Sequence, residues 1–552
     1  MKKVLPLLLV LACLITAQAF AAGTEESGGA TAPGFNATGF PIVDQPVTIN
    51  VVWQRWGSHV KAPDEMILMQ RVREQTGVDV NWIAVDSAAW QEKTNLMLAS
   101  GDLPDTFGSP LSDYTIISNG EAGSFIRLNE LIEDYGHNLR DQLERKPSLK
   151  AWLTAPNGDI YALPKLNEGS WVTVCPISYL NKLWLDDMGE SVPTTTDEFY
   201  DLMVKVKNAG DLNGNGKADE IPYSFKYEDC AGGLASFFWA HGLPTRNGEG
   251  GNNAWIVIRD SKVIFAPNEQ GFKDTAKYLN RLWEAGVLDE ESFSQDHGRW
   301  SAKYKQNQLM AFPNWWVQNE VDKSRWLDWE YMPALKAPGY EPSVSYRFGW
   351  SRGLAPITVA AKHPEVVMRW IDSFYEPEMS IQVMEGPLGV RTEKKADGTF
   401  NVLPTPEGLG LSEWRDSETI GPGFITSIDE GMYLNLFLFE AAEMCGTIKI
   451  RYYKEDWPEQ FWPNPMFTSE QITEENKYLP DVKAIVSKTL ARWIVEGNAD
   501  AEWDKFQKDL DDAGLPKLMA IWQDNMDKFL AGTGGTTPRP HEKGLGTEVS
   551  PY

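Results

Sequence analysis

The segments VTINVVW (47–53), PDEMILMQRVREQT (63–76) and VDVNWIAV (78–85) decide the fold of this chain. The first and the third are rich in β-branched residues and have the length of strands. The second has apolar residues at helical spacing and stops at Gly77. A further helix is predicted over 89–99. Strands that alternate with helices of this length form βαβ units, so the sequence predicts an α/β fold with a parallel sheet.

The chain of 552 residues is long enough for a large core and at least two lobes. Helical periodicity continues to the C-terminal part, where 474–530 is mostly amphipathic helix broken at Gly497 and Gly514. The other predicted helices are 128–135, 181–188, 196–207, 268–285 and 364–375. The sequence therefore predicts an α/β body with a helical C-terminal layer.

Both ends of the chain have the composition of segments outside the fold. Residues 1–22 combine a basic start, an apolar run and small residues at cleavage positions, which is typical of a secretory signal peptide. We expect a flexible linker at 23–43 and a disordered Gly/Thr/Pro-rich tail at 532–552. The protein is therefore expected to be exported, to the periplasm or the outer face of the cytoplasmic membrane. Cys13 leaves a lipid anchor open.

The chain is strongly acidic, with 51 Lys and Arg against 78 Asp and Glu and a formal net charge of −27. This balance disfavours nucleic acid and anionic membranes as partners, because proteins bind both mainly through basic residues. A neutral ligand fits best. After the signal peptide the cysteines are Cys175, Cys230 and Cys445, so at most one disulfide can form, and its pairing stays open.

The segment DLNGNGKADE at 211–220 has the spacing of a calcium loop. Oxygen-bearing side chains occupy its positions 1, 3, 5, 9 and 10, and a glycine at position 6 allows the sharp turn. This matches the first nine positions of an EF-hand loop, in which position 7 contributes its main-chain carbonyl. We predict a structural Ca²⁺ site here. The alternative is an Asn/Gly-rich turn between a helix and a strand.

Tryptophan is unusually frequent, with 23 residues, as many as phenylalanine. Indole faces pack against the C–H faces of sugar rings, and the indole N–H can bind a hydroxyl, so tryptophans in loop-like contexts indicate a carbohydrate site. For each of them the alternative is core packing. The stacking candidates are Trp53, Trp56, Trp171, Trp239, Trp315, Trp316 and Trp350. Asp105 and Arg352 are candidates for binding hydroxyls, because charged groups form the stronger hydrogen bonds.

Several short motifs follow one another in a fixed order along nearly the whole mature chain. They are NLMLASGDLPD (95–105), NGDIYALP (157–164), LNKLWLD (180–186), VPTTTDEF (192–199), the calcium loop, WDKF (503–506) and IWQ (521–523). In this order the chain resembles the extracellular solute-binding proteins of bacterial ABC importers, family 1 type. Within that family it is similar to the oligosaccharide subgroup of LplA-like lipoproteins and alginate-binding proteins.

The resemblance implies a bilobal periplasmic-binding-protein fold, type II-like, with two chain-discontinuous lobes, a hinge and extra C-terminal helices. We expect the N-terminal lobe at 44–165 plus 345–400 and the C-terminal lobe at 166–344 plus 401–531. The lobes would close on a ligand by hinge motion. The calcium ligands that the resemblance implies are Asp211, Asn213, Asn215, the carbonyl of Lys217, Asp219 and Glu220.

The implied function is that of the substrate-binding component of a carbohydrate ABC transporter. It would capture an oligosaccharide in an aromatic-lined cleft between the lobes and deliver it to the permease. The implied partners are the permease subunits in the membrane, with a separate ATPase. We expect a monomer without enzymatic activity.

Other classes of function compete with this one. GWSRG at 349–353 fits the G-x-S-x-G nucleophile elbow, but Pro356 and β-branched residues follow it where a helix is required. Neither His363 nor His541 is placed as a hydrolase triad requires. A secreted calcium-containing glycoside hydrolase or polysaccharide lyase is the main alternative, because it needs only two carboxylates across a sugar site. A surface adhesin or scaffold is a third class.

Overall fold

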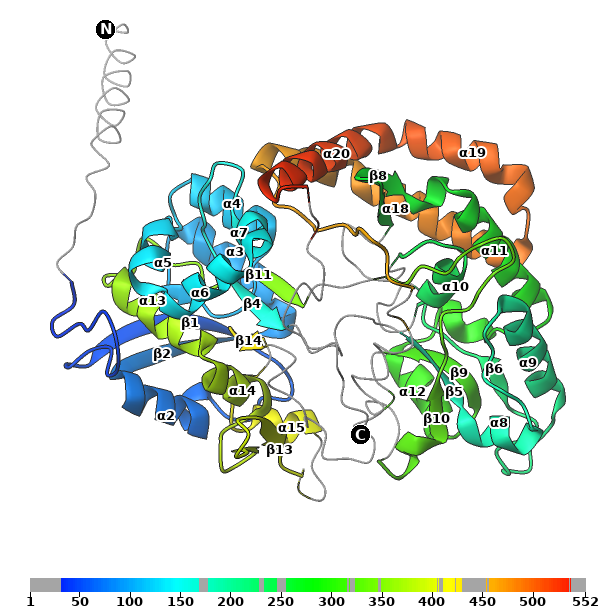
Figure 1. Ribbon diagram of the computed structural model, residues 1–552, viewed down its shortest axis with the longest axis horizontal. Helices are drawn as coiled ribbons and strands as arrows, with labels where there is room; N and C mark the ends of the chain where they lie inside the picture. Colours follow the sequence, from blue (N-terminus) through cyan, green and yellow to red (C-terminus); the bar gives the residue numbers. More distant parts are fainter. Residues whose placement is uncertain are drawn as a thin grey trace, which may run out of the picture.

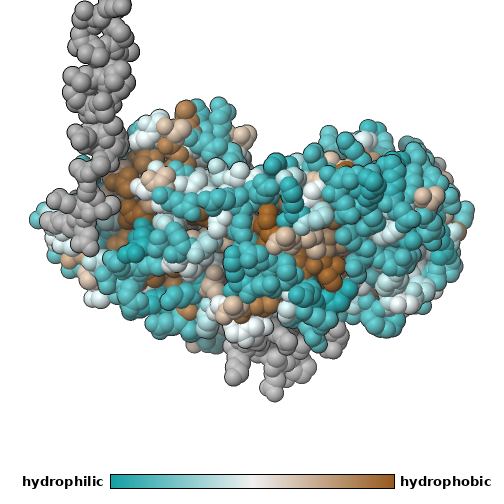
Figure 2. All heavy atoms as spheres, turned by 90° about the horizontal axis from the view of Figure 1, so that it is seen from above, coloured by the Kyte–Doolittle hydropathy of each residue, from teal (hydrophilic) through white to brown (hydrophobic). Residues whose placement is uncertain are grey.

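The computed structural model describes residues 31–167, 177–227, 233–245, 255–314, 317, 323–345, 349–404, 406, 411–421, 423–428, 453, 456–535 and 537. They form two lobes of mixed α/β structure that lie side by side, with helices arching over one end (Figure 1). The surface is largely hydrophilic, and its upper edge dips between the lobes (Figure 2). The predicted signal peptide and most of the predicted tail lie outside the described residues.

The first lobe is built on a parallel sheet in the order β2-β1-β3. Its strands are β1 (Val47–Arg55), β2 (Val78–Asp86) and β3 (Thr106–Phe107). Helix α2 (Ile67–Thr76) connects β1 to β2, and α3 (Trp90–Ser100) connects β2 to β3. Each helix ends at a glycine in the left-handed region, Gly77 (φ 73°) and Gly101 (φ 77°), where a side chain would be strained. The predicted βαβ order is confirmed.

The rest of the first lobe comes from two distant parts of the chain. The earlier part supplies α4 (Asp113–Glu121), α5 (Asn129–Tyr135), α6 (His137–Arg145) and α7 (Pro147–Leu153). The later part supplies α13 (Pro364–Asp372), α14 (Pro377–Glu385), α15 (Leu411–Asp416) and the hairpin β12 (Thr392–Lys394) and β13 (Phe400–Val402). Trp53 of β1 and Trp370 of α13 share one buried core. The lobe is therefore chain-discontinuous, as expected.

The second lobe has a mixed sheet in the order β10-β5-β9-β6. Its strands are β5 (Ile177–Asn181), β6 (Ile221–Tyr223), β9 (Leu309–Asn314) and β10 (Trp329–Tyr331). Its helices and hairpin are α8 (Lys182–Met188), α9 (Thr196–Asn208), α10 (Ala235–Ala240), α11 (Gln270–Glu284), α12 (His297–Lys305), β7 (Ile256–Arg259) and β8 (Lys262–Phe265). Thr195 and Glu198 form a capping box at the start of α9, where the sequence predicts a helix start.

The C-terminal layer consists of α18 (Ser469–Glu496), α19 (Ala499–Asp512) and α20 (Leu515–Gly532). The breaks fall at Gly497 and Gly514, as predicted. The layer covers both lobes (Figure 1), because Trp493 of α18 lies in a core that includes second-lobe residues, whereas Phe529 of α20 lies in the first-lobe core. No helix within the described ranges is long and apolar enough to cross a membrane.

Three strands at the border of the first lobe form a small sheet in the order β11-β4-β14. They are β4 (Leu163–Asn167), β11 (Trp350–Leu354) and β14 (Ser427–Ile428). The chain passes between the lobes next to each strand, since β4 precedes β5 and β11 follows the segment after β10. One sheet therefore gathers the connections between the lobes, which is the arrangement of a hinge.

Two expected boundaries need correction. Residues 401–428 were expected in the C-terminal lobe, yet β14 pairs with β4 and Thr419 Oγ1 donates to Val383 O of α14 at 2.9 Å, so this segment belongs to the first lobe. Residues 31–43 were expected to be a flexible linker. Instead Ile42 is fully buried in the first-lobe core, because burial removes its apolar side chain from water. In addition, Ala32 N donates to Glu365 at 2.8 Å.

Candidate functional site

The loops after β1 and β3 lie against the segment that leads to hinge strand β14. A Cβ atom on Gly108 would come within 2.8 Å of Phe424, and one on Gly423 within 2.8 Å of the Trp56 ring. Only glycine fits at these close approaches. In α/β sheets, ligands bind outside the carboxyl ends of the strands. The carboxyl end of β1, beside the hinge, is therefore where the first lobe is expected to contact a ligand.

A buried polar cluster lies at this carboxyl end. Ser58 Oγ donates to Asp416 Oδ2 at 2.5 Å, and Arg415 Nε donates to Asp416 Oδ1 at 2.6 Å. Asp416 is fully buried. His59 accepts from the Trp56 N–H at 3.2 Å through Nδ1, and its buried Nε2 lies near the backbone of Ile420. Burial lowers the pKa of His59 below 6.5, although Asp416 opposes the shift, so the imidazole is kept neutral.

A fully buried guanidinium adjoins this cluster. Arg391 lies with its guanidinium 4.5 Å from the centre of the Trp414 ring, and its three side-chain nitrogens have no hydrogen-bond partner. Burial lowers its pKa to about 10, while Glu385 acts in the opposite direction. Burial likewise raises the pKa of Glu385, against the pull of Arg415 and Arg391. Unpaired buried donors of this kind are unfavourable in free energy.

Together these residues have the chemistry that recognises a polyhydroxyl ligand. Glu385 supplies a carboxyl group and the half-buried indoles of Trp56 and Trp414 supply apolar faces, while the buried Arg391, His59 and Asp416 lie behind them. We refer to His59, Glu385, Arg391, Trp414 and Asp416, with Trp56, as the first-lobe cluster.

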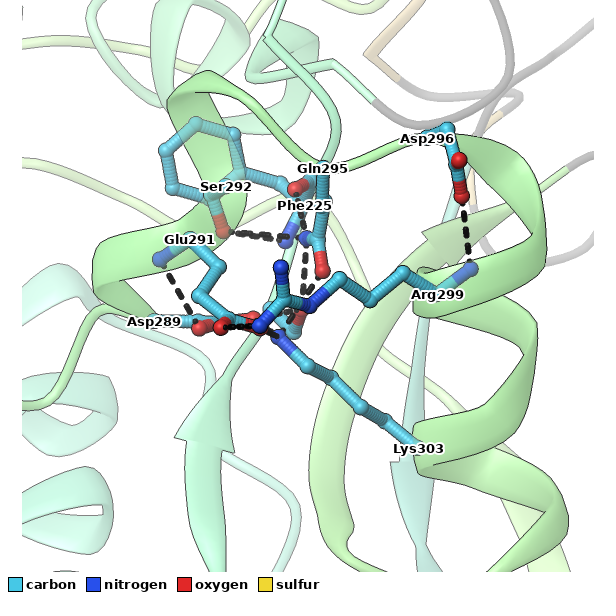
Figure 3. Close-up of polar contacts among 9 residues, drawn as sticks. Phe225, Asp289, Glu291, Ser292, Gln295, Asp296, Arg299 and Lys303 are labelled. Carbon is cyan, nitrogen blue, oxygen red and sulfur yellow. Dashed lines mark hydrogen bonds and ion pairs between the residues drawn. The ribbon is translucent and has the colours of Figure 1, made fainter.

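A second polar network supports the second lobe behind the carboxyl end of β6 (Figure 3). Lys303 is buried and pairs with Asp289 at 2.5 Å and Glu291 at 2.9 Å, and it donates to Gln295 at 2.8 Å. Gln295 Nε2 in turn donates to Phe225 O at 2.7 Å. Arg299 also pairs with Glu291, so the two cations match the carboxylates of Asp289 and Glu291. The network therefore fixes the chain after β6 and is not itself suited to bind a charged ligand.

Two of the predicted stacking residues are core residues. Trp53 is 2% exposed and packs edge-on against His59 at 4.8 Å. Trp239 is 1% exposed and donates its Nε1–H to Thr245 O at 2.8 Å. Neither offers a free ring face, so the predicted stacking role is corrected to packing. The reason is local: Trp53 continues the inward-facing alternation of Ile49 and Val51, and Trp239 lies on the wholly buried helix α10.

Both predicted hydroxyl-binding residues hold the backbone together instead. Asp105 Oδ2 accepts from Asn50 N at 2.6 Å and Nδ2 at 2.8 Å, which joins the start of β3 to β1. Arg352 pairs with Asp113 and also donates to the carbonyl of Trp152. The half-buried Trp350 packs against the Trp152 ring at 5.8 Å. These contacts correct the predicted role of Asp105 and Arg352.

Of the predicted residues that the structure describes, Trp56 is the one brought into the first-lobe cluster. Trp171, Trp315 and Trp316 lie outside the described residues. Sequence reasoning missed His59, Glu385, Arg391, Trp414 and Asp416. Contacts between residues some 330 to 360 positions apart bring them together, and no local spacing marks them.

The predicted calcium loop is tightly curled by its own side chains. Asp211 accepts from the N–H groups of Asn215 at 3.0 Å and Gly216 at 2.8 Å. Asp219 Oδ1 accepts from the amides of Asn213 at 3.1 Å and Asn215 at 3.0 Å. A hydrogen bond from Gln308, joined by those of the two amides, lowers the pKa of Asp219 and keeps it ionised. Oxygens of five side chains are thus gathered in one loop.

Glu220 closes the loop. Its Oε1 accepts from the N–H groups of Leu212 at 2.6 Å and Asn213 at 3.0 Å, whereas its Oε2 is buried with no hydrogen-bond partner. Within the described part of the chain, no three His, Cys, Asp or Glu side chains converge as a metal site. A cation here would therefore depend on amide and main-chain oxygens as well. An all-oxygen donor set with one orphaned carboxylate oxygen fits Ca²⁺.

Comparison with known proteins agrees with this architecture. A family model for bacterial extracellular solute-binding proteins matches residues 65–380. The chain is 30% identical over 547 residues to the fructooligosaccharide ABC transporter substrate-binding protein FusA of Streptococcus pneumoniae, over 94% of this chain and 98% of FusA. Among solved structures, FusA in complex with kestose superimposes with a TM-score of 0.77 at 28% identity, over 88% of this chain and 100% of FusA. A FusA EF-hand mutant with fructo-nystose gives a TM-score of 0.76 at the same identity and coverage.

Proposed function

This chain belongs to the bacterial extracellular solute-binding proteins, and from that membership we propose that it captures an oligosaccharide between its lobes and delivers it to an ABC importer. The observation that carries the proposal is the similarity to FusA, which extends through both lobes, the hinge and the C-terminal layer. Because FusA is a fructooligosaccharide-binding protein, a fructooligosaccharide is the first ligand to test.

The first-lobe cluster supplies half of the proposed site. Sugar C–H faces would pack on Trp56 and Trp414, while the carboxyl group of Glu385 would form hydrogen bonds with sugar hydroxyls. Arg391 is fully buried and would hold the Trp414 ring in place for the sugar. Binding is thereby coupled to this lobe, and contacts with the other lobe would favour closure.

The opposite wall of the site remains a proposal from the sequence. Trp171, Trp315 and Trp316 are the residues that we propose there, since β5 begins after Trp171 and β9 ends just before Trp315. The net charge of −27 supports a neutral sugar over an anionic one. The membrane permease and a separate ATPase are the proposed partners of the exported, monomeric protein.

Calcium would stabilise the second lobe in this proposal. Asp211, Asn213, Asn215, the Lys217 carbonyl, Asp219 and Glu220 would hold it, and the loop joins α9 to β6. When bound, the ion neutralises the acidic side chains and fixes the entry to β6. Its role is structural, because the loop lies away from the first-lobe cluster, on another lobe.

We propose that the protein releases its sugar unchanged. A glycoside hydrolase needs two free carboxyl groups across the scissile bond. In the first-lobe cluster both oxygens of Asp416 are engaged, one by Ser58 and one by Arg415, so Asp416 is poorly suited to act as an acid or a nucleophile. The relatives are binding proteins of transporters, which supports the same conclusion.

Calorimetric titration with a series of fructooligosaccharides tests the proposal. We expect one high-affinity sugar per molecule and a thermal stabilisation of about 2.7 kcal/mol at a hundredfold excess over Kd. Chromatography of the recovered sugar after several hours should show the original compound. Lack of stabilisation by any neutral oligosaccharide in a broad panel would refute transport binding, and shortened products would favour the hydrolase or lyase.

A further inference from the structure

A separate cavity of about 510 Å³ lies between α2 and β2 of the first lobe. Both elements are on the side of this lobe that faces away from the second lobe (Figure 1). The cavity is therefore distinct from the proposed interlobe site. Its volume is within the range of about 300–1,000 Å³ that small-molecule sites occupy, and it is large enough for one or two sugar units.

The cavity has an apolar floor and a polar rim. Val72 and Val78 contribute to the floor, where Trp82 and Trp370 lie with their ring centres 6.0 Å apart. Trp82 is only half-buried, so its indole is accessible from the cavity side of the sheet. An exposed indole above a floor of valine and tryptophan is a suitable surface for the C–H face of a sugar ring.

The rim consists of side chains that exchange hydrogen bonds with hydroxyls. Asp64, Gln70 and Glu74 line it, together with Arg73, which is paired with Asp79 at 2.5 Å. The one guanidinium in the lining is thus already matched by a carboxylate. The remaining carboxylates would repel an anion, so the rim favours a neutral, hydroxyl-bearing ligand.

Trp370 lies beneath this surface. It is fully buried, and its ring centre lies 6.0 Å from that of Trp82. The indole N–H signal of Trp370 should therefore respond to a ring that packs against Trp82.

We propose that this cavity is a second saccharide-binding site, on the outer face of the first lobe. It takes one or two neutral sugar units, which stack on Trp82 and form hydrogen bonds with the rim through their hydroxyls. The inference rests on the proposed function only for the choice of probe. Because the rim residues Asp64, Gln70 and Glu74 are exposed to solvent, its affinity is expected to be the weaker of the two.

A sugar titration followed by ¹H–¹⁵N NMR tests this proposal. The indole N–H signals of the tryptophans are recorded during titration with kestose and, separately, with maltotriose. Trp82→Phe and Trp370→Phe assign the two signals of the outer cavity. We expect a set of signals that saturates at low sugar concentration and reports the interlobe site. The Trp82 and Trp370 signals should shift at a concentration at least tenfold higher.

Matched variants separate the possibilities. Trp82→Ala should abolish the second shift at Trp370 and leave the first set unchanged, whereas Trp503→Ala, a half-buried tryptophan of the C-terminal layer, should alter neither. The inference is overturned if the Trp370 signal shifts with neither sugar. It is also overturned if that signal shifts with the same midpoint as the first set, because the shift then reports lobe closure. If only the signals that saturate at low sugar concentration are missing, the proposed function is contradicted. The Trp370 signal then still tests whether a sugar binds in the outer cavity.

Discussion

The guanidinium of Arg352 and the carboxylate of Asp113 form a bidentate ion pair, with Nε–Oδ1 at 2.9 Å and Nη2–Oδ2 at 2.6 Å. Arg352 is on hinge strand β11 and Asp113 opens α4. The same guanidinium donates to Asn464 O at 2.9 Å, in the segment that leads to α18. One buried side chain thus ties the hinge sheet, the first lobe and the approach to the C-terminal layer together.

Replacing Arg352 by Ala should therefore destabilise the protein strongly. The change leaves Asp113 and several buried carbonyls without a donor, which corresponds to a loss of about 2–4 kcal/mol. Arg55→Ala is the matched control, since Arg55 pairs with Asp86 on the surface and should cost less than about 1 kcal/mol. Thermal unfolding of the two variants checks this. Similar melting temperatures for both would show that Arg352 is not an anchor.

Trp56 and Trp53 should separate binding from folding. Trp53→Ala removes a core side chain and should cost about 3–5 kcal/mol of stability. Trp56→Ala removes a half-buried indole of the first-lobe cluster, so we expect a small change in melting temperature and at least a tenfold weaker sugar affinity, about 1.4 kcal/mol. Calorimetry and thermal unfolding measure both. Wild-type affinity in folded Trp56→Ala would remove that residue from the site.

The calcium loop gives a conditional prediction. Asp211→Ala should lower the melting temperature more in calcium than in EGTA, because the side chain would bind the ion in addition to accepting from Asn215 and Gly216. Asp397→Ala is the control, since Asp397 lies in a first-lobe turn and accepts from Thr399 without belonging to the loop. It should have the same small effect with and without calcium. An equal loss for Asp211→Ala in both conditions would speak against metal binding.

His59 predicts a pH dependence. Its pKa is lowered by burial, so the unfolded chain binds a proton at higher pH than the folded protein does. Stability should then fall as the pH drops below about 6.5, through the interval down to the folded pKa. In His59→Gln the decrease between pH 7.5 and 6 should be smaller. The raised pKa of Glu385 acts in the opposite direction at lower pH, which is why the comparison stops at pH 6. An unchanged slope in His59→Gln would contradict the account.

Most of the fold follows from local sequence patterns. The strands and helices over 47–99 were predictable because alternation, helical periodicity and terminal glycines act within a few residues. The glycine breaks at Gly497 and Gly514 are of the same kind. The position of 401–428 was not predictable in this way, since it depends on the pairing of β14 with β4, some 260 residues away.

The candidate site was predictable only in part. The alternation of Ile49, Val51 and Trp53 indicates that the Trp53 side chain faces the core. This alternation is a stronger indication than the loop-like sequence context from which a stacking role was predicted. The meeting of His59 with Asp416, in contrast, depends on tertiary packing, as does the burial of Arg391 against Trp414. Residue type alone does not show which charged groups lose their partners on folding.

Small-angle X-ray scattering with and without a saturating oligosaccharide tests the central claim most directly. If two hinged lobes close on the sugar, the radius of gyration should decrease with the midpoint that calorimetry gives. In Trp56→Ala the midpoint of this decrease should move to an at least tenfold higher sugar concentration. A scattering profile that is unchanged while the sugar is demonstrably bound would contradict the account.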